Sequence, residues 1–129
     1  MLLVKTKIRE SPIHGIGLFA DEPIKKGTTI WKFAPGFDLD FSEKDLKNLS
    51  GPSKEQFLKY IYMTKNKGMI LCFDDARFLN HSENPNCEDI DPDDFEEGFT
   101  IAKKDIKTGE ELTVNYRTFD FNWKNKLNK

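Results

Sequence analysis

The chain has 129 residues, a formal net charge of −2 and 33% charged residues. This length predicts one domain, and the 11 phenylalanines can furnish a core that needs no metal or disulfide. No apolar run approaches the ~18 residues of a membrane span, and the N-terminus lacks the order of a signal peptide. Two cysteines do not make a secreted disulfide framework. We therefore expect a single domain over residues 1–129 that is intracellular, in the cytoplasm or a nucleus, and makes no contact with membranes.

The first third of the chain predicts short strands joined by glycine turns. Residues 2–10 alternate loosely in polarity, and residues 28–33 are rich in β-branched and aromatic types, so both stretches indicate strands. A turn over residues 11–17 contains a Gly-Ile-Gly step, and a second turn over residues 22–27 ends in glycine.

The middle of the chain is more helical. A short helix is predicted over residues 42–49, where a Gly-Pro step ends it. A second helix is predicted to begin with Ser53 as its N-cap, and Gln56 would complete a capping box. Its apolar face would consist of Phe57, Leu58, Tyr60 and Ile61. Residues 69–73 then predict a strand.

The second half returns to strands. Residues 99–102 and 111–116 predict strands, whereas the acidic stretch 88–98 has almost no structural propensity of its own. The stretch 101–112 echoes the stretch 19–30, because each reads as a strand, a turn with glycine and another strand. The echo predicts two similar β-corners in a mostly β protein with short helices.

The stretch 77–87 combines polar residues with a buried character. Asn80 and Asn86 can each donate and accept hydrogen bonds, and Pro85 restricts the backbone around it. A Phe-Leu step just before Asn80 indicates burial. Since buried amides need partners, this stretch is predicted to form internal hydrogen bonds, to bind a ligand, or to do both.

Three common kinds of site find little support among the residues. The His and Cys residues, His14, Cys72, His81 and Cys87, are not paired at zinc-ligand spacing, so no metal site is predicted. His81 and Ser82 are neighbours in sequence, which is not the geometry of a nucleophile and its base. The Gly-Ile-Gly step lacks the third glycine and the following helix of a dinucleotide fingerprint.

Three blocks of sequence stand out together. They are Gly15-Ile16-Gly17-Leu18-Phe19-Ala20, then Ala76-Arg77-Phe78-Leu79-Asn80-His81-Ser82 with Pro85-Asn86-Cys87, then Gly109-Glu110-Glu111-Leu112-Thr113-Val114-Asn115-Tyr116. In order and spacing these blocks resemble the SET domain of protein lysine methyltransferases. The resemblance implies a β-clip-like fold of small sheets with a knot-like C-terminal crossing. It also implies S-adenosyl-L-methionine as the methyl donor and the side-chain amine of a protein lysine as the acceptor.

The resemblance also implies roles for individual residues. Tyr116 would be the catalytic tyrosine, and the small side chain of Val114 could leave room for di- or trimethylation unless another residue fills the space. The residues implied to bind the cofactor are Gly15, Ile16, Gly17, Asn80, His81, Tyr116 and Trp123. Those implied to line the substrate channel are Tyr60, Tyr62, Val114 and Phe121, with the choice between the two tyrosines left open. A tail over residues 117–129 would close the site through one of its aromatic residues, Phe119, Phe121 or Trp123, unless these residues only pack a final short helix against the core.

The chain departs from the family pattern in several places. Phe73-Asp74 stands where the family often has Gly-Asn, and Glu83 stands where a cysteine often follows Asn-His-Ser. No cysteine-rich segment flanks the domain, so the chain resembles a minimal SET protein. Asp91, Asp93 and Asp94 in the acidic stretch would either steer a basic segment of a lysine-bearing protein or peptide toward the site or belong to a merely solvated charged loop.

Two alternative functions stay open on the sequence alone. One is a non-catalytic β-clip-like binding module, and the other is a SET-fold methyltransferase with an acceptor other than lysine. The joint presence of Tyr116 and Asn80-His81 favours an enzyme, because an inactive descendant has no reason to keep them together. No direct contact with nucleic acid is expected, and a homodimer that completes the channel is a further expectation.

Overall fold

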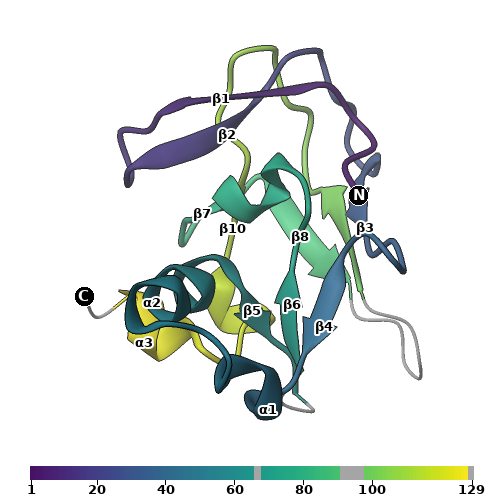
Figure 1. The fold of residues 1–129 in the computed structure, drawn as a ribbon. Coiled ribbons are helices and arrows are strands. Elements are labelled where there is room, and N and C mark those ends of the chain that lie inside the picture. The colour runs from purple at the N-terminus through teal and green to yellow at the C-terminus, as the bar shows by residue number, and fades with distance from the viewer. Residues whose placement is uncertain (66–67, 91–97, 128–129) are drawn as a thin grey trace.

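A computed structural model describes residues 1–65, 68–90 and 98–127 of the chain. Within these residues short strands form four small sheets, and short α-helices lie at one end of the molecule (Figure 1). The strands are β1 (Thr6–Glu10), β2 (Ile16–Ala20), β3 (Thr29–Lys32), β4 (Leu39–Phe41), β5 (Tyr62–Met63), β6 (Met69–Leu71), β7 (Asn80–His81), β8 (Cys87–Ile90), β9 (Phe99–Ala102) and β10 (Thr113–Val114). The predicted mostly β fold with short helices is confirmed. The predicted steering residues Asp91, Asp93 and Asp94 lie outside the described residues.

The first sheet is the antiparallel hairpin of β1 and β2. Its register pairs Thr6 with Ala20 and Glu10 with Ile16. β1 is largely exposed, whereas every residue of β2 after Ile16 is buried. The hairpin therefore covers the core with its second strand. The strand predicted over residues 2–10 is confirmed in its second half.

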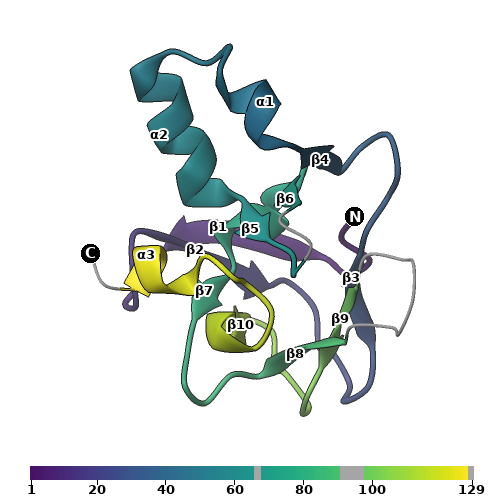
Figure 2. The same ribbon diagram turned by 90° about the horizontal axis from the view of Figure 1, so that it is seen from below.

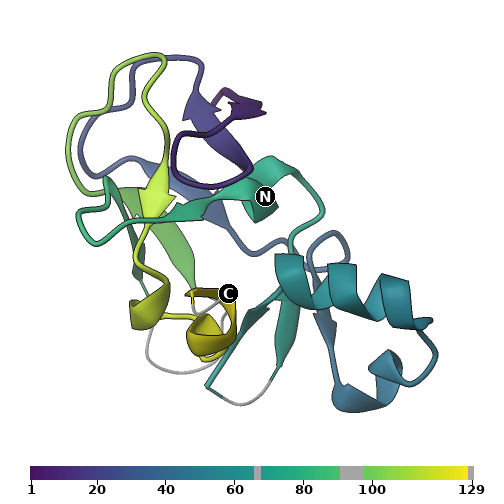
Figure 3. The same cartoon turned by 90° about the vertical axis from the view of Figure 1, so that its left-hand side faces the viewer.

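The two predicted β-corners pair with each other at one end of the molecule (Figure 3). Ile24 and Ile106 exchange backbone hydrogen bonds of 2.9 and 2.8 Å. Gly27 and Gly109 have φ of +88° and +91°, a region where a Cβ is penalised. Each of these glycines donates its N–H at 2.8 Å to an alanine carbonyl of the opposite corner. The corners thus close one another, and their apolar residues form the centre of the larger core.

A three-stranded sheet of β3, β9 and β8 continues from the corners. β9 pairs antiparallel with both of its neighbours, which confirms the strands predicted at 28–33 and 99–102. The prediction that residues 88–98 lack structure is wrong in its first part, because residues 88–90 belong to β8. Pairing with β9, which places Ile90 opposite Phe99, outweighs the low strand propensity of Glu88 and Asp89.

Helices α1 (Glu43–Leu46) and α2 (Gly51–Tyr60) stand away from the sheets on one side (Figure 2). α1 is shorter than the helix predicted over 42–49. The predicted start of α2 is wrong: Ser50 rather than Ser53 is the N-cap, and its hydroxyl accepts from the Ser53 N–H at 3.3 Å. Pro52 fits in the first turn, where its missing N–H breaks no helical hydrogen bond.

The predicted apolar face of α2 is the covered side of this helix: no residue of the helix is fully buried, but Phe57, Leu58 and Tyr60 are half-buried. Ile61, the C-cap, is the residue of the predicted face that enters the core, where it is 0% exposed. It leads into the sheet of β4, β6 and β5, and β6 confirms most of the strand predicted at 69–73. None of the described helices has the length and apolar character that crossing a membrane requires.

The C-terminal segment reaches the centre of the molecule through the parallel pairing of β10 with β7. Thr113 lies opposite Asn80 in this pairing. β10 is shorter than the predicted strand 111–116, because the Asn115 side chain accepts the Arg117 N–H at 3.1 Å and starts a 3₁₀ helix over Tyr116–Thr118. The chain then ends in helix α3 (Trp123–Leu127).

Candidate active site

The central stretch 77–87 is tied to the N-terminal turn by Asn80. This residue is 8% exposed, and its Nδ2 donates to the carbonyls of His14 at 3.0 Å and Ile16 at 3.3 Å. The same nitrogen lies 3.0 Å from Glu111 Oε2. One buried amide therefore joins all three sequence blocks of the motif.

The Glu111 carboxylate is the second member of this network. It accepts hydrogen bonds from Ser11 Oγ at 2.7 and 2.9 Å. A Cβ on Gly17 would lie 2.7 Å from Glu111 Oε2, so the absence of a side chain there lets the carboxylate approach. Gly15 serves a different purpose: it turns the chain at φ of +48°, with nothing within 4 Å of where a Cβ would stand.

Asn86 fastens the C-terminal segment from the other side. It is 5% exposed, its Nδ2 donates to the Glu111 carbonyl at 2.8 Å, and its Oδ1 accepts the Thr113 N–H at 2.9 Å. The side-chain amide thus makes the hydrogen bonds that a neighbouring strand would make to the Glu111 carbonyl and the Thr113 N–H. The prediction that Asn80 and Asn86 serve internal hydrogen bonds is confirmed.

Tyr116 is held at both its backbone and its hydroxyl. Its N–H donates to His81 Nδ1 at 3.1 Å, and its hydroxyl donates to the Leu79 carbonyl. Because Nδ1 accepts, a neutral His81 ring carries its proton on Nε2, which lies 3.2 Å from Glu83 Oε1. The predicted catalytic tyrosine is therefore in direct contact with the predicted Asn-His step.

The environment of Tyr116 keeps its phenol protonated. Burial raises the pKa of the hydroxyl well above its usual value, and the nearby carboxylates of Asp120 and Glu111 act in the same direction. A phenol of this kind donates a hydrogen bond at neutral pH and does not act as a general base. Such a hydroxyl can orient a neighbouring group through a hydrogen bond.

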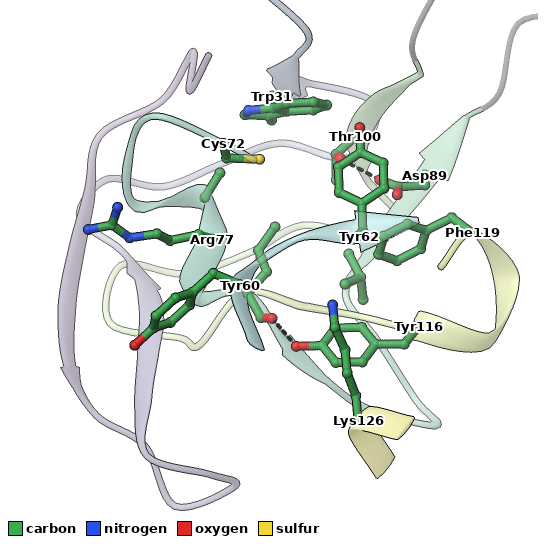
Figure 4. Close-up of a pocket in the computed structure, with 13 residues that line it drawn as sticks. Trp31, Tyr60, Tyr62, Cys72, Arg77, Asp89, Thr100, Tyr116, Phe119 and Lys126 are labelled. Atoms are coloured by element: carbon green, nitrogen blue, oxygen red, sulfur yellow. Dashed lines mark hydrogen bonds between the residues drawn. The ribbon is translucent and has the colours of Figure 1, made fainter. Parts of the chain in front are cut away.

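Tyr116 lines a cavity of about 50 Å³, which Figure 4 shows. Aromatic rings make up much of its wall. The Tyr62 ring lies 6.4 Å from Trp31 and 5.6 Å from Phe119, and Phe119 lies 6.1 Å from Tyr116, each measured between ring centroids. Neighbouring rings meet edge to face at 72–89°. Such walls exclude water, and ring faces attract cations.

Polar groups stand at separate points of the cavity wall. Thr100 Oγ1 donates to Asp89 Oδ1 at 2.5 Å. Burial raises the pKa of the Asp89 carboxyl to about 6, and the hydrogen bond from Thr100 opposes this rise. Lys126, from α3, also lines the cavity. The site therefore combines an aromatic wall with one titratable carboxyl and one amine.

The predicted channel residues divide into two groups. Tyr60, Tyr62 and Val114 all line the cavity, so both tyrosines reach it. Phe121 is 65% exposed and does not belong to the lining. Phe119, two residues earlier in the tail, stands in the wall instead.

The predicted cofactor residues lie around Tyr116 and the Gly-Ile-Gly turn. Gly15, Ile16 and Gly17 lie beside Asn80 through the hydrogen bonds described above, and Ile16 is 48% exposed. Trp123 is half-buried outside the cavity lining, with the cations of Arg117 and Lys124 at 5.0 and 5.6 Å from its ring centroid. Over residues 1–65, 68–90 and 98–127, no group of three or more His, Cys, Asp or Glu side chains is placed to hold a metal ion.

Several residues of the cavity wall were missed by sequence reasoning. Trp31, Asp89, Thr100 and Lys126 come from β3, β8, β9 and α3. Trp31, Asp89 and Thr100 lie in strands whose patterns are ordinary, and Lys126 is one of several lysines in the tail. Asp120, which pairs with Lys126, did carry a signal, because it is an acid between two phenylalanines.

Comparison with known proteins agrees with this geometry. The family model described as the SET domain matches residues 15–117. The human histone-lysine N-methyltransferase SETD1B is 29% identical over 118 residues, which cover 88% of this chain and 6% of that protein. An H3 lysine-4 specific histone-lysine N-methyltransferase of Aspergillus oryzae is 29% identical over 134 residues, which cover 91% of this chain and 10% of that protein. The chain thus spans a tenth or less of the length of these relatives.

A solved structure supports the fold. The crystal structure of a Plasmodium falciparum protein, described as a candidate histone methyltransferase, superposes with a TM-score of 0.63 at 21% sequence identity. The superposition covers 89% of this chain and 95% of that one. The family model, in turn, covers the Asn80–Glu111 network and Tyr116 together. The chain belongs to the SET-domain family.

Proposed function

We propose that this chain transfers a methyl group from S-adenosylmethionine to the side-chain amine of a lysine in an intracellular protein. The observation that carries the proposal is the placement of Tyr116, whose hydroxyl is held against the Leu79 carbonyl at the wall of an aromatic cavity. The names of the human and Aspergillus relatives, both histone-lysine N-methyltransferases, support a lysine as the acceptor.

The groups around the cavity suit the demands of this reaction. Methyl transfer to an amine needs a neutral nitrogen, alignment and little water more than it needs a strong acid or base. The protonated hydroxyl of Tyr116 and the carbonyl of Leu79 provide fixed dipoles that can orient an amine and its neighbouring carbon. The rings of Tyr62 and Phe119 restrict the approach of water. Bound S-adenosylmethionine would supply the electrophilic methyl group on its sulfonium.

The residues present fit such a cofactor beside the Gly-Ile-Gly turn. A Cβ at Gly15 would meet nothing within 4 Å, and Ile16 is 48% exposed, so a ligand can approach this backbone. Asn80 ties the turn to the strand that precedes Tyr116. In the tail, the Arg117 cation and the Trp123 ring offer partners for a carboxylate and for an adenine. The cofactor-binding role of these residues is part of the proposal.

The acceptor would enter between the aromatic walls. Tyr60, Tyr62 and Val114 keep their proposed place in the substrate channel, and Phe119 joins them. Val114 is 2% exposed and its isopropyl group is small compared with an aromatic side chain. We therefore propose that the channel admits a lysine that already carries a methyl group, which mass spectrometry of the products would reveal.

The test is a cofactor titration followed by a transfer assay. Isothermal titration with S-adenosylmethionine should show binding, and a labelled methyl group should then appear on histones or on proteins of a cell lysate. Tyr116→Phe removes only the hydroxyl, so it should keep cofactor binding but lower transfer by a factor of 100 or more, on the order of 3 kcal/mol in the barrier. Phe37→Ala, an exposed aromatic residue outside the cavity, is the matched control.

The outcomes separate the proposal from its alternatives. If the chain folds but does not bind S-adenosylmethionine, it is a binding module and the proposal fails. If it binds the cofactor but labels a small molecule or another side chain, the acceptor is wrong while the methyltransferase assignment stands. If Tyr116→Phe transfers methyl as fast as the parent chain, the role of the hydroxyl is refuted.

A further inference from the structure

The last helix places a lysine side chain at the wall of the cavity. The Lys126 side chain is 16% exposed, and its Nζ lies 2.7 Å from Asp120 Oδ2. The same nitrogen donates to the Ile61 carbonyl and stands 5.2 Å from the centroid of the Tyr116 ring, over its face. Figure 4 shows the amine rising past Tyr116 into the space below Tyr62. Three different groups that favour a cation therefore converge on one point.

Asp120 is set up to receive a cation at this point. It is 1% exposed, and its Oδ1 accepts the N–H groups of Met63 at 3.0 Å and Asn122 at 2.9 Å. Among the described residues Oδ2 has no hydrogen-bond partner of good geometry, and its contact with Lys126 is an ion pair. A buried carboxylate oxygen of this kind requires a positive charge beside it.

The helix that delivers Lys126 is weakly held. α3 has five residues and none of them is buried. A helix of this length has little stability of its own in water. By contrast, Asp120 and Ile61 are 1% and 0% exposed and belong to the body of the domain. The receiving groups therefore lie in the core, whereas the amine that fills them lies on a short helix without a buried residue.

We propose that Asp120, the Ile61 carbonyl and the Tyr116 ring form a binding subsite for a primary alkylammonium group, which Lys126 fills until a substrate lysine takes its place. That the natural ligand is a substrate lysine rests on the proposed function, whereas the subsite itself does not. A lysine side chain arrives at neutral pH as the same charged amine on the same four-carbon stem, so the subsite receives it before it gives up its proton to solvent for methyl transfer. Lys126 is thus an internal competitor for the incoming side chain.

The first test replaces Lys126 and supplies the missing amine from solution. Lys126→Ala should lower the Tm, because it leaves Asp120 without its cation, and n-butylammonium should raise the Tm of this variant by several degrees. The control variant is Lys124→Ala, since Lys124 is on the same helix but is exposed, with its amine over Trp123. Neither this variant nor the parent chain should respond, and n-butanol should have no effect on any of the three. An equal response in Lys124→Ala, or none in Lys126→Ala, would overturn the subsite.

The second test needs no variant and no cofactor. Amine acetylation of the parent chain, followed by mass spectrometry, should label Lys126 more slowly than Lys124, and n-butylammonium should raise the ratio of the rate at Lys126 to the rate at Lys124. This ratio does not depend on how much reagent the added amine consumes. Equal rates at the two lysines, unchanged by the added amine, would refute the proposal even if Lys126→Ala did not fold. Neither test involves methyl transfer. A chain that responds to the amine but transfers no methyl group would therefore refute the proposed function without refuting the subsite.

Discussion

The two β-corners, residues 18–30 and 100–112, share a backbone but differ in their chemistry. Ile24 in the first corresponds to Ile106 in the second, and each bonds to the other. The Ala20 N–H donates to the Glu110 carbonyl at 2.9 Å, and the equivalent Ala102 N–H donates to the Thr28 carbonyl at 2.9 Å. The main-chain hydrogen bonds of one corner are thus repeated in the other.

The side chains break this symmetry at several positions, two of which concern the site. Leu18 in the first corner is 0% exposed in the core, whereas its counterpart Thr100 donates to Asp89 at the cavity wall. Thr29 in the first corner corresponds to Glu111, which binds Ser11 and Asn80 in the second. The repeated backbone is therefore a scaffold, and only the second corner carries the polar groups that organise the site.

The largest expected loss of stability comes from replacing Glu111, one of the residues at which the corners differ. Glu111→Ala leaves the Asn80 amide and the Ser11 hydroxyl without their carboxylate partner, so it should lower the free energy of unfolding by about 3 kcal/mol. The equivalent Thr29→Ala should cost less than about 1 kcal/mol. Urea unfolding of both variants measures the difference. Equal losses would mean that the corners are alike in energy as well as in backbone.

The next effect tests the approach of Glu111 to the Gly-Ile-Gly turn. In Gly17→Ala the new Cβ would lie 2.7 Å from Glu111 Oε2, and the carboxylate is held there by Ser11 and Asn80. We expect a loss of about 2 kcal/mol from this overpacking. Gly51→Ala is the control, because a Cβ at this helical position meets nothing within 4 Å. Thermal unfolding of the two variants checks the prediction, and a neutral Gly17→Ala would contradict it.

A third effect depends on pH and concerns Asp89, the partner of Thr100. The counterpart of Thr100 in the first corner, Leu18, has no hydroxyl to make such a hydrogen bond. Burial raises the pKa of Asp89 from 3.8 to about 6, so its ionised form costs stability near neutrality. This cost is absent below pH 3.8, grows as the pH rises from 3.8 to about 6, and is constant above that. Asp89→Asn, which keeps an acceptor for the Thr100 hydroxyl, should therefore be more stable than the parent chain at pH 7 by about 1–2 kcal/mol.

Unfolding of the parent and of Asp89→Asn at pH 4, 5, 6 and 7 measures this difference in stability directly. The advantage of the variant should shrink toward zero at the acidic end. A difference that stays constant across the series would show that the carboxyl does not titrate in this range, and that its environment resembles the open surface.

The smallest effect concerns the feature that the corners share. Gly27 and Gly109 have nearly the same positive φ and nearly the same hydrogen bonds. Replacing either by alanine should lower the free energy of unfolding by about 1 kcal/mol, because a Cβ is strained in this conformation. Similar unfolding midpoints for the two variants would support the backbone symmetry. Clearly different unfolding midpoints would mean that the two corners share their hydrogen bonds but not the energetic cost of a Cβ at the glycine.

Local patterns predicted the strands well where the local signals agree with one another. β9 agrees with its predicted range because alternation and β-branched residues act together, and both corners were visible in their glycine turns. The failures occur where two local signals compete or where a distant partner decides. Ser50 and Ser53 could each cap α2, and Pro52 favours the earlier one. Residues 88–90 form a strand only because β9 lies beside them.

The sequence by itself determined the family, the small-sheet architecture and the link between Tyr116 and the Asn80-His81 step. These features follow from the order and spacing of the three motif blocks and from the family that the blocks resemble. Only the tertiary structure decided the composition of the cavity, where Trp31, Asp89 and Lys126 meet. These side chains come from segments that are far apart in the sequence. Local periodicity predicts which face of a strand or helix a residue occupies, but it does not predict which distant residues that face will contact.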